Sequence, residues 1–194
     1  HRKMNRIHSF KSAQMTKQLK ATNANSQNAP QEENWVFIDL QNLYKGVQER
    51  GWKINWPSFR SHLTHKYSAV KAVIFTGFVS GNEWLYRKLT MAGFQVETRP
   101  TRILPDGTID GGNCDADLAS YVMDYKADYS KAIIVADDAD YYRTIQSLQR
   151  QNKLRLIISS HLLANTSSLI KQAVSRDMLV SIHGLRNQIS QTIN

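Results

Sequence analysis

Apolar runs and amphipathic stretches alternate along most of this 194-residue chain. Short runs rich in β-branched and aromatic residues predict buried strands, and apolar residues at helical spacing predict helices. Gly51, Gly93 and the sequence Pro105-Asp106-Gly107 predict two helix ends and a turn. The predicted strands cover residues 35–39, 69–78, 94–100, 131–137, 154–159 and 178–182, and the predicted helices cover 41–50, a stretch opening at 56–58, 82–92, 115–127, 140–152 and 166–175.

The predicted strands are apolar throughout, rather than on one face only. Such strands, alternating with helices, are typical of a parallel sheet that is covered on both sides. We therefore expect an α/β fold, a three-layer α/β/α sandwich with a mostly parallel central sheet, over residues 34–186. Residues 1–33 are expected to be a basic arm and linker, and residues 187–194 a C-terminal tail. In open sheets of this kind, ligands bind beyond the carboxyl ends of the strands.

The N-terminal arm differs from the rest of the chain in charge. Most of the net charge of +9 comes from this arm, because its first 30 residues include no Asp or Glu. A basic arm suits RNA or a nucleoprotein partner, although it could also be a solvated tail. Residues 1–20 could form a basic helix, and residues 21–33 are typical of a linker. The basic residues of the arm are Arg2, Lys3, Arg6, Lys11, Lys17 and Lys20.

Several classes of protein are disfavoured by what the sequence lacks. Cys114 is the only cysteine, which excludes a disulfide framework and a thiolate zinc site and fits a reducing, cytoplasmic location. No apolar run approaches the ~18 residues that span a membrane. A Gly-x-Ser-x-Gly sequence and a glycine-rich phosphate loop are both missing, which disfavours serine hydrolases and nucleotide triphosphatases. Nothing in the sequence decides between a monomer and a homodimer.

Aspartates gather where this fold places its ligands. Asp39 ends the first strand, Asp115 opens a helix, and Asp138 and Asp140 follow the fourth strand. Carboxylates at one sheet edge repel one another unless a cation neutralises them. Hard oxygen ligands suit Mg²⁺ or Mn²⁺. Each aspartate alone could be a helix cap or a solvated acid, but their common edge favours a metal site.

Other residues near these aspartates are candidates for supporting roles. Asn42 could add an amide oxygen or orient a water, whereas Asp137 is better suited to supporting the loop. Basic residues could steer phosphates, and tyrosines could stack on a base, although at least one of the tyrosines is expected to pack in the core. These candidate substrate contacts are Lys45, Arg99, Arg102, Tyr44 and Tyr141.

Three stretches in order resemble the NYN domains of the PIN-like nuclease superfamily, a group that includes bacterial LabA-like proteins. They are FIDLQNLY (37–44), GGNCDADLASYVMDY (111–125) and KAIIVADDADYY (131–142), and SSLIKQAV (167–174) also corresponds. The resemblance implies a PIN-like fold and a ribonuclease. It also implies that the four aspartates are catalytic and hold Mg²⁺ or Mn²⁺, with RNA as the substrate. The residues that match the family's acidic and amide positions are Asp39, Asn42, Asp115, Asp138 and Asp140.

The chain also departs from the family pattern. Leu40 and Gln41 stand where small residues are usual, and Asp137 and Ala139 replace Ser and Gly. Gly111 occupies a position that is commonly Lys. The acidic residues are kept, so metal-dependent hydrolysis of RNA phosphodiester bonds is the expected function. The departures leave an alternative open, which is a non-catalytic NYN-fold subunit that binds RNA or supports a nucleoprotein assembly.

Overall fold

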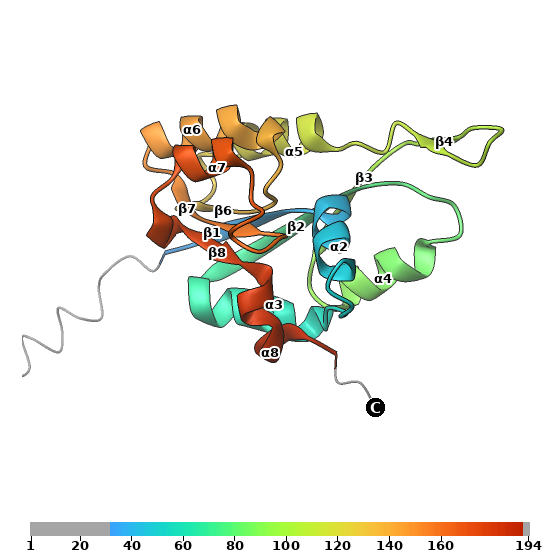
Figure 1. Ribbon diagram of the computed structural model, residues 1–194, viewed down its shortest axis with the longest axis horizontal. Helices are drawn as coiled ribbons and strands as arrows, with labels where there is room; N and C mark the ends of the chain where they lie inside the picture. The colour runs from blue at the N-terminus through green and yellow to red at the C-terminus, as the bar shows by residue number, and fades with distance from the viewer. Residues whose placement is uncertain (1–31, 192–194) are drawn as a thin grey trace, which may run out of the picture. The chain divides into compact units, whose positions relative to one another are not determined.

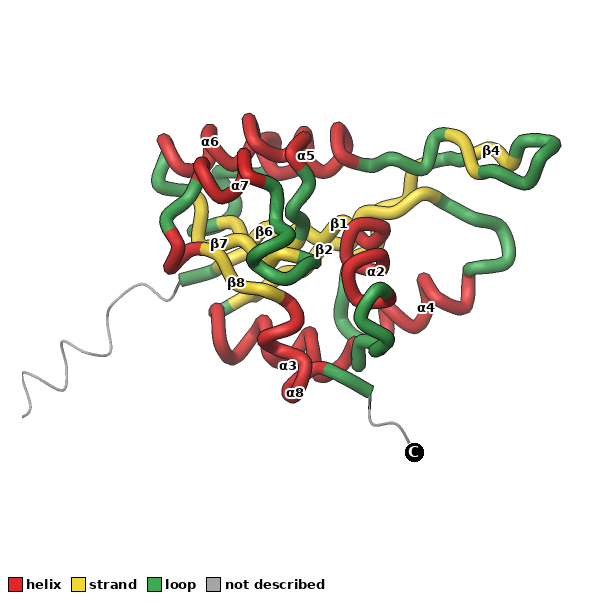
Figure 2. The backbone as a smooth tube through the Cα atoms, in the orientation of Figure 1, coloured by secondary structure: helices red, strands yellow, loops and turns green. Residues whose placement is uncertain are grey.

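The computed structural model describes residues 32–191. The basic arm, the helix predicted over residues 1–20 and nearly all of the linker lie outside the described residues. Within 32–191, helices pack on both faces of a central sheet (Figures 1 and 2). None of the helices in this part of the chain is long and apolar enough to cross a membrane.

Six parallel strands form the sheet, in the order β3-β2-β1-β6-β7-β8. The chain moves outward from β1 to β3 and then returns to the other side of β1 at β6. A sheet of this kind binds ligands at such a reversal, outside the carboxyl ends of the two central strands. The strands are β1 (Asn34–Asp39), β2 (Ala69–Gly77), β3 (Gln95–Arg99), β6 (Ala132–Val135), β7 (Leu154–Ser159) and β8 (Leu179–Ser181).

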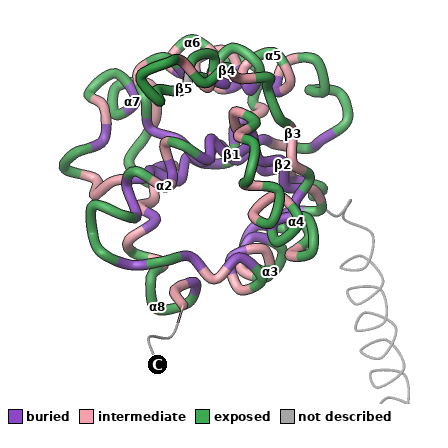
Figure 3. Tube along the Cα trace, turned by 90° about the vertical axis from the view of Figure 1, so that its right-hand side faces the viewer, coloured by how far each residue is buried: buried purple, intermediate pink, exposed green. Residues whose placement is uncertain are grey.

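Alternate residues of each strand enter two different hydrophobic layers. Val36 and Ile38 pack under α2, α3, α4 and α8, whereas Phe37 packs under α5, α6 and α7. Figure 3 shows β1 and β2 buried and exposed segments on the helices around them. This packing explains the continuous apolar strands and confirms the predicted three-layer sandwich. The helices are α2 (Leu40–Gln48), α3 (Trp56–Tyr67), α4 (Glu83–Met91), α5 (Asp115–Asp124), α6 (Tyr142–Arg150), α7 (Ser168–Ala173) and α8 (Arg186–Ile189).

The structure adds short elements to those predicted. A hairpin of β4 (Arg102–Ile103) and β5 (Ile109–Asp110) surrounds the predicted turn and extends away from the sheet (Figure 1). The described part of the chain also contains the 3₁₀ turns η1 (Ala139–Tyr141), η2 (Arg176–Met178) and η3 (Ile182–Leu185).

The folded body extends past the predicted start of the C-terminal tail. Residues 186–189 form α8, and Ile189 is fully buried in the layer that contains α3. The backbone N–H of Gln191 donates to the carbonyl of Lys53 at 2.9 Å. The expectation that residue 187 begins a tail is therefore wrong, because one buried apolar side chain anchors this segment.

Helix α2 packs unusually closely against the end of β7. A Cβ atom at Gly46 would lie 1.9 Å from the Ser160 carbonyl oxygen, so no larger residue fits there. This close approach fixes the helix that carries Asn42 and Lys45.

Candidate functional site

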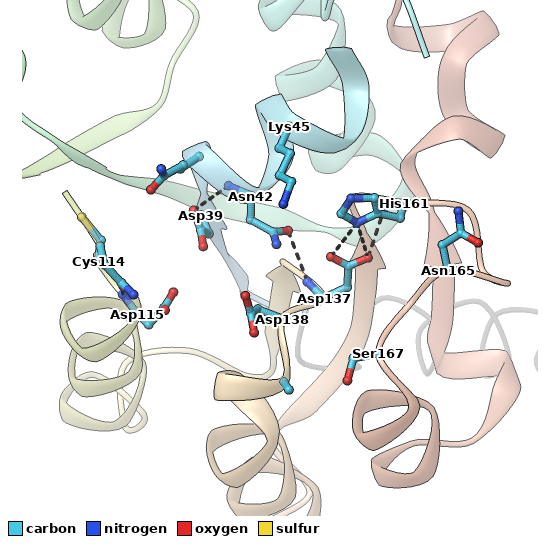
Figure 4. Close-up of a pocket in the computed structure, with 13 residues that line it drawn as sticks. Asp39, Asn42, Lys45, Cys114, Asp115, Asp137, Asp138, His161, Asn165 and Ser167 are labelled. Carbon is cyan, nitrogen blue, oxygen red and sulfur yellow. Dashed lines mark hydrogen bonds and ion pairs between the residues drawn. The ribbon is translucent and has the colours of Figure 1, made fainter. Parts of the chain in front are cut away.

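A pocket of about 440 Å³ lies at the carboxyl ends of β1 and β6, where the strand order reverses. Three of the four predicted ligands line it, namely Asp39, Asp115 and Asp138. Figure 4 shows their carboxylates facing a common space, with Asn42 and Lys45 reaching in from α2. The other lining residues are Gln41, Asn113, Cys114, Asp137, Ala139, His161, Asn165 and Ser167.

Asp39 has two roles, since it ends β1 and caps α2. Its carboxylate accepts a hydrogen bond from the Asn42 backbone N–H at 3.0 Å, and only 9% of the residue is exposed. Burial raises the pKa of Asp39, because desolvation disfavours the charged form. Hydrogen bonds from Asn42 and Tyr141 oppose this rise in pKa, whereas the nearby charge of Asp115 adds to it. A cation in the pocket would relieve both unfavourable effects.

Tyr141 joins the carboxylates of Asp39 and Asp115. Its hydroxyl oxygen lies 3.0 Å from Asp39 Oδ2 and 2.5 Å from Asp115 Oδ1. Burial raises the pKa of Tyr141, and both aspartates raise it further, so the phenol keeps its proton. A phenol has only one hydrogen to donate. One of the two oxygen–oxygen contacts therefore repels, unless a carboxyl takes up a proton or a cation balances the charge.

The predicted stacking role of Tyr141 is wrong. The residue is 1% exposed and sits in the layer between the sheet and α5, so neither face of its ring can meet a base. Its place in the core follows from the helical turn η1, which directs the ring inward.

Asp138 and Asp140 stand at different positions relative to the pocket. Asp138 lines it and caps η1, accepting from the Asp140 backbone N–H at 3.3 Å. Asp140 is exposed and is not among the lining residues. The structure thus brings together three of the four predicted aspartates and places the fourth outside the pocket lining.

A hydrogen-bonded network holds the opposite side of the pocket. Asp137 is 4% exposed and accepts from Ser159 Oγ at 2.5 Å and from the His161 backbone N–H at 3.2 Å. The His161 ring lies between Asp137, 3.0 Å from Nδ1, and Glu49, 3.6 Å from Nε2. Asn42 Oδ1 accepts from the Asp137 N–H at 3.4 Å, which ties α2 to the loop after β6.

The remaining predicted contacts lie outside the acidic pocket, apart from Lys45. Arg99 and Arg102 form exposed ion pairs, at 3.1 Å with Asp117 and 3.2 Å with Asp110. Such pairs contribute about 0–1 kcal/mol, so both guanidinium groups can exchange their partners for a phosphate. Tyr44 is half-buried beside Trp56, with ring centroids 6.0 Å apart.

Cys114 lines the pocket but is unsuited to be a nucleophile. Burial raises the pKa of its thiol to about 11, with Asp117 and Asp39 adding to the effect. The thiol is therefore neutral near pH 7, and the reactive thiolate is scarce.

The pocket residues have the chemistry to bind a divalent cation, but their side chains are not arranged around one point. Carboxylate oxygens with an amide nearby are the ligands that Mg²⁺ and Mn²⁺ prefer. Two acceptors share the single hydrogen of Tyr141, which leaves negative charge to be balanced. Over residues 32–191, however, no three Asp, Glu, His or Cys side chains stand close enough together to hold an ion.

His161, Asn113, Asn165 and Ser167 line the pocket without having been chosen as candidates. The strand-end rule that selected Asp39 also applies to β7, and it would have found His161 two residues beyond the end of that strand. The two asparagines lie in connecting loops, where no periodic pattern marks them.

A parallel sandwich with acidic side chains at the reversal of strand order has the architecture of the PIN-like nuclease fold. The family model for the NYN domain matches residues 34–179, and the chain belongs to this family. The resemblance noted in the sequence is thereby confirmed at the level of the family.

Among solved structures, the chain is similar to that of a protein of unknown function from Vibrio parahaemolyticus. The TM-score is 0.67 and the sequence identity 20%, over 84% of this chain and 99% of that chain. At this identity the likeness shows the fold alone. A second solved structure, the T5 D15 protein co-crystallised with metal ions, matches with a TM-score of only 0.41. The sequence identity is 14%, over 70% of this chain and 56% of that chain. No curated protein sequence matches the chain.

Proposed function

We propose that this NYN domain is a metal-dependent ribonuclease that hydrolyses RNA phosphodiester bonds. The observation that carries the proposal is the Tyr141 hydroxyl, which holds Asp39 and Asp115 within reach of one another. Asp138 faces the same pocket. Membership of a PIN-like nuclease family supports a nucleic-acid substrate.

Each residue of the pocket has a part in this proposal. Asp39, Asp115 and Asp138 would hold Mg²⁺ or Mn²⁺, and Asp140 would act from outside by ordering Asp138 through its backbone N–H. A bound divalent cation would supply charge neutralisation for a phosphate and lower the pKa of water. Lys45 places its positive charge on the pocket, where it can contact a phosphate oxygen.

The surrounding residues position the carboxylates and attract the RNA. Tyr141 orients two of the carboxylates, and Asn42 holds the loop that presents Asp138. Arg99 and Arg102 would steer the RNA backbone from their exposed positions. The buried, neutral thiol of Cys114 fits a cytoplasmic location, where thiols stay reduced.

The rival function is a non-catalytic RNA-binding or structural subunit of a nucleoprotein assembly. One observation favours it, namely that no three ligating side chains converge between residues 32 and 191. In that case the acidic pocket would have no catalytic role, and RNA binding would depend on basic residues such as Lys45 and those of the arm.

A cleavage assay separates the two functions. Labelled single-stranded RNA is incubated with Mn²⁺ and either the wild type or the variant Asp39→Asn/Asp138→Asn, and in parallel with the wild type in excess EDTA. Asn can still cap α2, so the fold is preserved. Loss of electrostatic stabilisation should lower the cleavage rate by about 10²–10³-fold. EDTA should abolish cleavage.

Asp128→Asn is the matched control, because Asp128 is exposed and lines no cavity near the pocket. It should cleave as the wild type does. If the wild type cleaves no faster than the double variant while both bind RNA equally, the enzymatic proposal is wrong and the rival function is supported.

A further inference from the structure

A second cavity, of about 810 Å³, adjoins the acidic pocket. It is formed by α2, the connection from β2 to α4, α4 itself and the loop before α5. Gln41, Lys45 and Asn113 line both cavities, so the two lie side by side. A chain molecule bound in one can therefore extend into the other. We call this cavity the tyrosine groove, after Tyr44 and Tyr86.

Both tyrosines are held in place by the fold. Tyr44 packs edge-on against Trp56, and the Tyr86 hydroxyl donates to the Gly77 carbonyl at 3.2 Å and accepts from the Val79 N–H at 2.9 Å. Both side chains are half-buried, so part of each ring remains accessible. Fixed rings lose little conformational freedom when a ligand binds, which favours stacking on a flat partner.

The rest of the lining suits a nucleobase. Leu40, Leu85 and Val79 add apolar surface. The side-chain amides of Gln41, Gln48, Asn82 and Asn113 can pair with the polar edges of a base.

Charge distinguishes the tyrosine groove from the acidic pocket. Among residues 32–191, Lys45 is the only charged residue that lines the groove, whereas four aspartates line the pocket. A polyanion is therefore attracted at the junction of the two cavities and meets no repulsion in the groove. The volume of the tyrosine groove lies within the range of about 300–1,000 Å³ that is typical of small-ligand sites.

We infer that the tyrosine groove binds an unpaired base of a nucleic-acid strand whose neighbouring phosphate occupies the acidic pocket. A base within a duplex is already stacked and paired, so only a single-stranded or splayed-out base can enter. The substrate of the proposed site would therefore be single-stranded RNA. This inference rests on the proposed function, in which the protein binds RNA. Tyr44 was a candidate from the sequence, whereas Tyr86 and the shape of the groove emerge only from the fold.

The test measures binding of a fluorescein-labelled ten-nucleotide RNA by anisotropy, with Mn²⁺ present. The protein carries Asp39→Asn/Asp138→Asn, which slows cleavage and removes two negative charges from the pocket. An abasic nucleotide is moved through the RNA one position at a time. Removal of the base that occupies the groove should weaken binding about tenfold at one position and little at the others.

Tyr44→Ala should produce a similar loss with the intact RNA and little further loss with the RNA that is abasic at that position. Such non-additivity links the residue to the base. Tyr44→Phe keeps the ring and should bind as the parent does. Tyr125→Ala is the control, because Tyr125 is 40% exposed and lines neither cavity. The abasic series uses the parent protein, so the test stands even if Tyr44→Ala fails to fold.

The outcomes separate this inference from the proposed function. If every abasic position binds equally, if duplex RNA binds as tightly as the single strand, or if no RNA binds, the inference is overturned. Position-dependent binding without any cleavage by the wild type would support the groove and refute the ribonuclease. Cleavage that is indifferent to missing bases and to Tyr44→Ala would support the ribonuclease and refute the groove.

Discussion

Asp39 and Asp137 are both buried aspartates at the carboxyl ends of neighbouring strands, yet their surroundings differ. Asp137 accepts hydrogen bonds from Ser159 and from the His161 backbone, donors that serve no other carboxylate. Asp39 shares the Tyr141 hydroxyl with Asp115, and burial raises its pKa. On the Asp137 side of the pocket, the hydrogen-bonding needs of the carboxylate are met within the protein. On the Asp39 side, negative charge remains that an external group can balance.

This difference separates structural acids from functional ones more clearly than burial does. A buried carboxylate with its own donors stabilises the fold, because removing it strands those donors. A buried carboxylate that competes for a donor costs stability and is better explained by a ligand. Substitutions on the two sides should therefore differ in how much they lower stability and metal-dependent activity.

The largest effect on stability is expected on the satisfied side. Asp137→Ala should lower the free energy of unfolding by about 3 kcal/mol, because the Ser159 hydroxyl and the His161 N–H lose a buried charged acceptor and keep only neutral ones. Asp138→Ala, at the adjacent exposed position, should cost about 1 kcal/mol through loss of the η1 cap. Urea unfolding of both variants measures the difference. Equal losses for the two variants would show that the buried hydrogen bonds of Asp137 do not stabilise the fold more than the exposed cap formed by Asp138.

A smaller effect is expected on the other side, where two carboxylates compete for one donor. Tyr141→Phe removes the hydroxyl between Asp39 and Asp115 and should lower the free energy of unfolding by about 2 kcal/mol in metal-free protein. Tyr142→Phe is the matched control, since the Tyr142 hydroxyl contacts only Gln146 among the described residues and should be nearly neutral. Urea unfolding in EDTA is the measurement. An unchanged midpoint for Tyr141→Phe would show that the hydroxyl does not relieve the repulsion.

The smallest effect concerns the histidines that follow β7 and β8. His161 lies between two carboxylates, whereas His183 accepts from Trp52 Nε1 at 3.0 Å and has Arg50 and Arg186 nearby. Burial lowers the pKa of His183, and the arginines lower it further. Because the unfolded chain then binds more protons than the folded one, stability should fall as the pH drops below about 6.5.

His183→Gln should remove this contribution and flatten the decline in stability. Thermal unfolding of wild type and variant between neutral and mildly acidic pH measures the change. A decline equally steep in both proteins would place the responsible proton elsewhere.

Much of the fold could be predicted because its periodic patterns are strong. The strands 131–137 and 154–159 were found within a few residues, since runs such as AIIV are buried on both faces. The hairpin of β4 and β5 was missed apart from its turn, because its two-residue strands are too short to show alternation. The tail after residue 187 was wrongly predicted because a single Ile189 anchors it.

The acidic pocket was predictable in outline and not in detail. Strand ends placed Asp39, Asp115 and Asp138 at one edge, which the pocket reproduces. The inward turn of Tyr141 could not be read from its neighbours, because it depends on how η1 packs against α5. The tyrosine groove likewise brings together Tyr44 on α2 and Tyr86 on α4, and no spacing in the sequence predicts that proximity.

The strand order has a consequence for the chain during its own synthesis. β6, which adjoins β1 at the middle of the sheet, is made only after β2, β3 and the helices between them. A ribosome that has completed Asp39 and Asp115 has not yet produced Asp138 or the network around Asp137. Unfinished chains would therefore lack the proposed activity. The messenger RNA being translated would not be cleaved by the nascent protein until β6 emerges and docks beside β1.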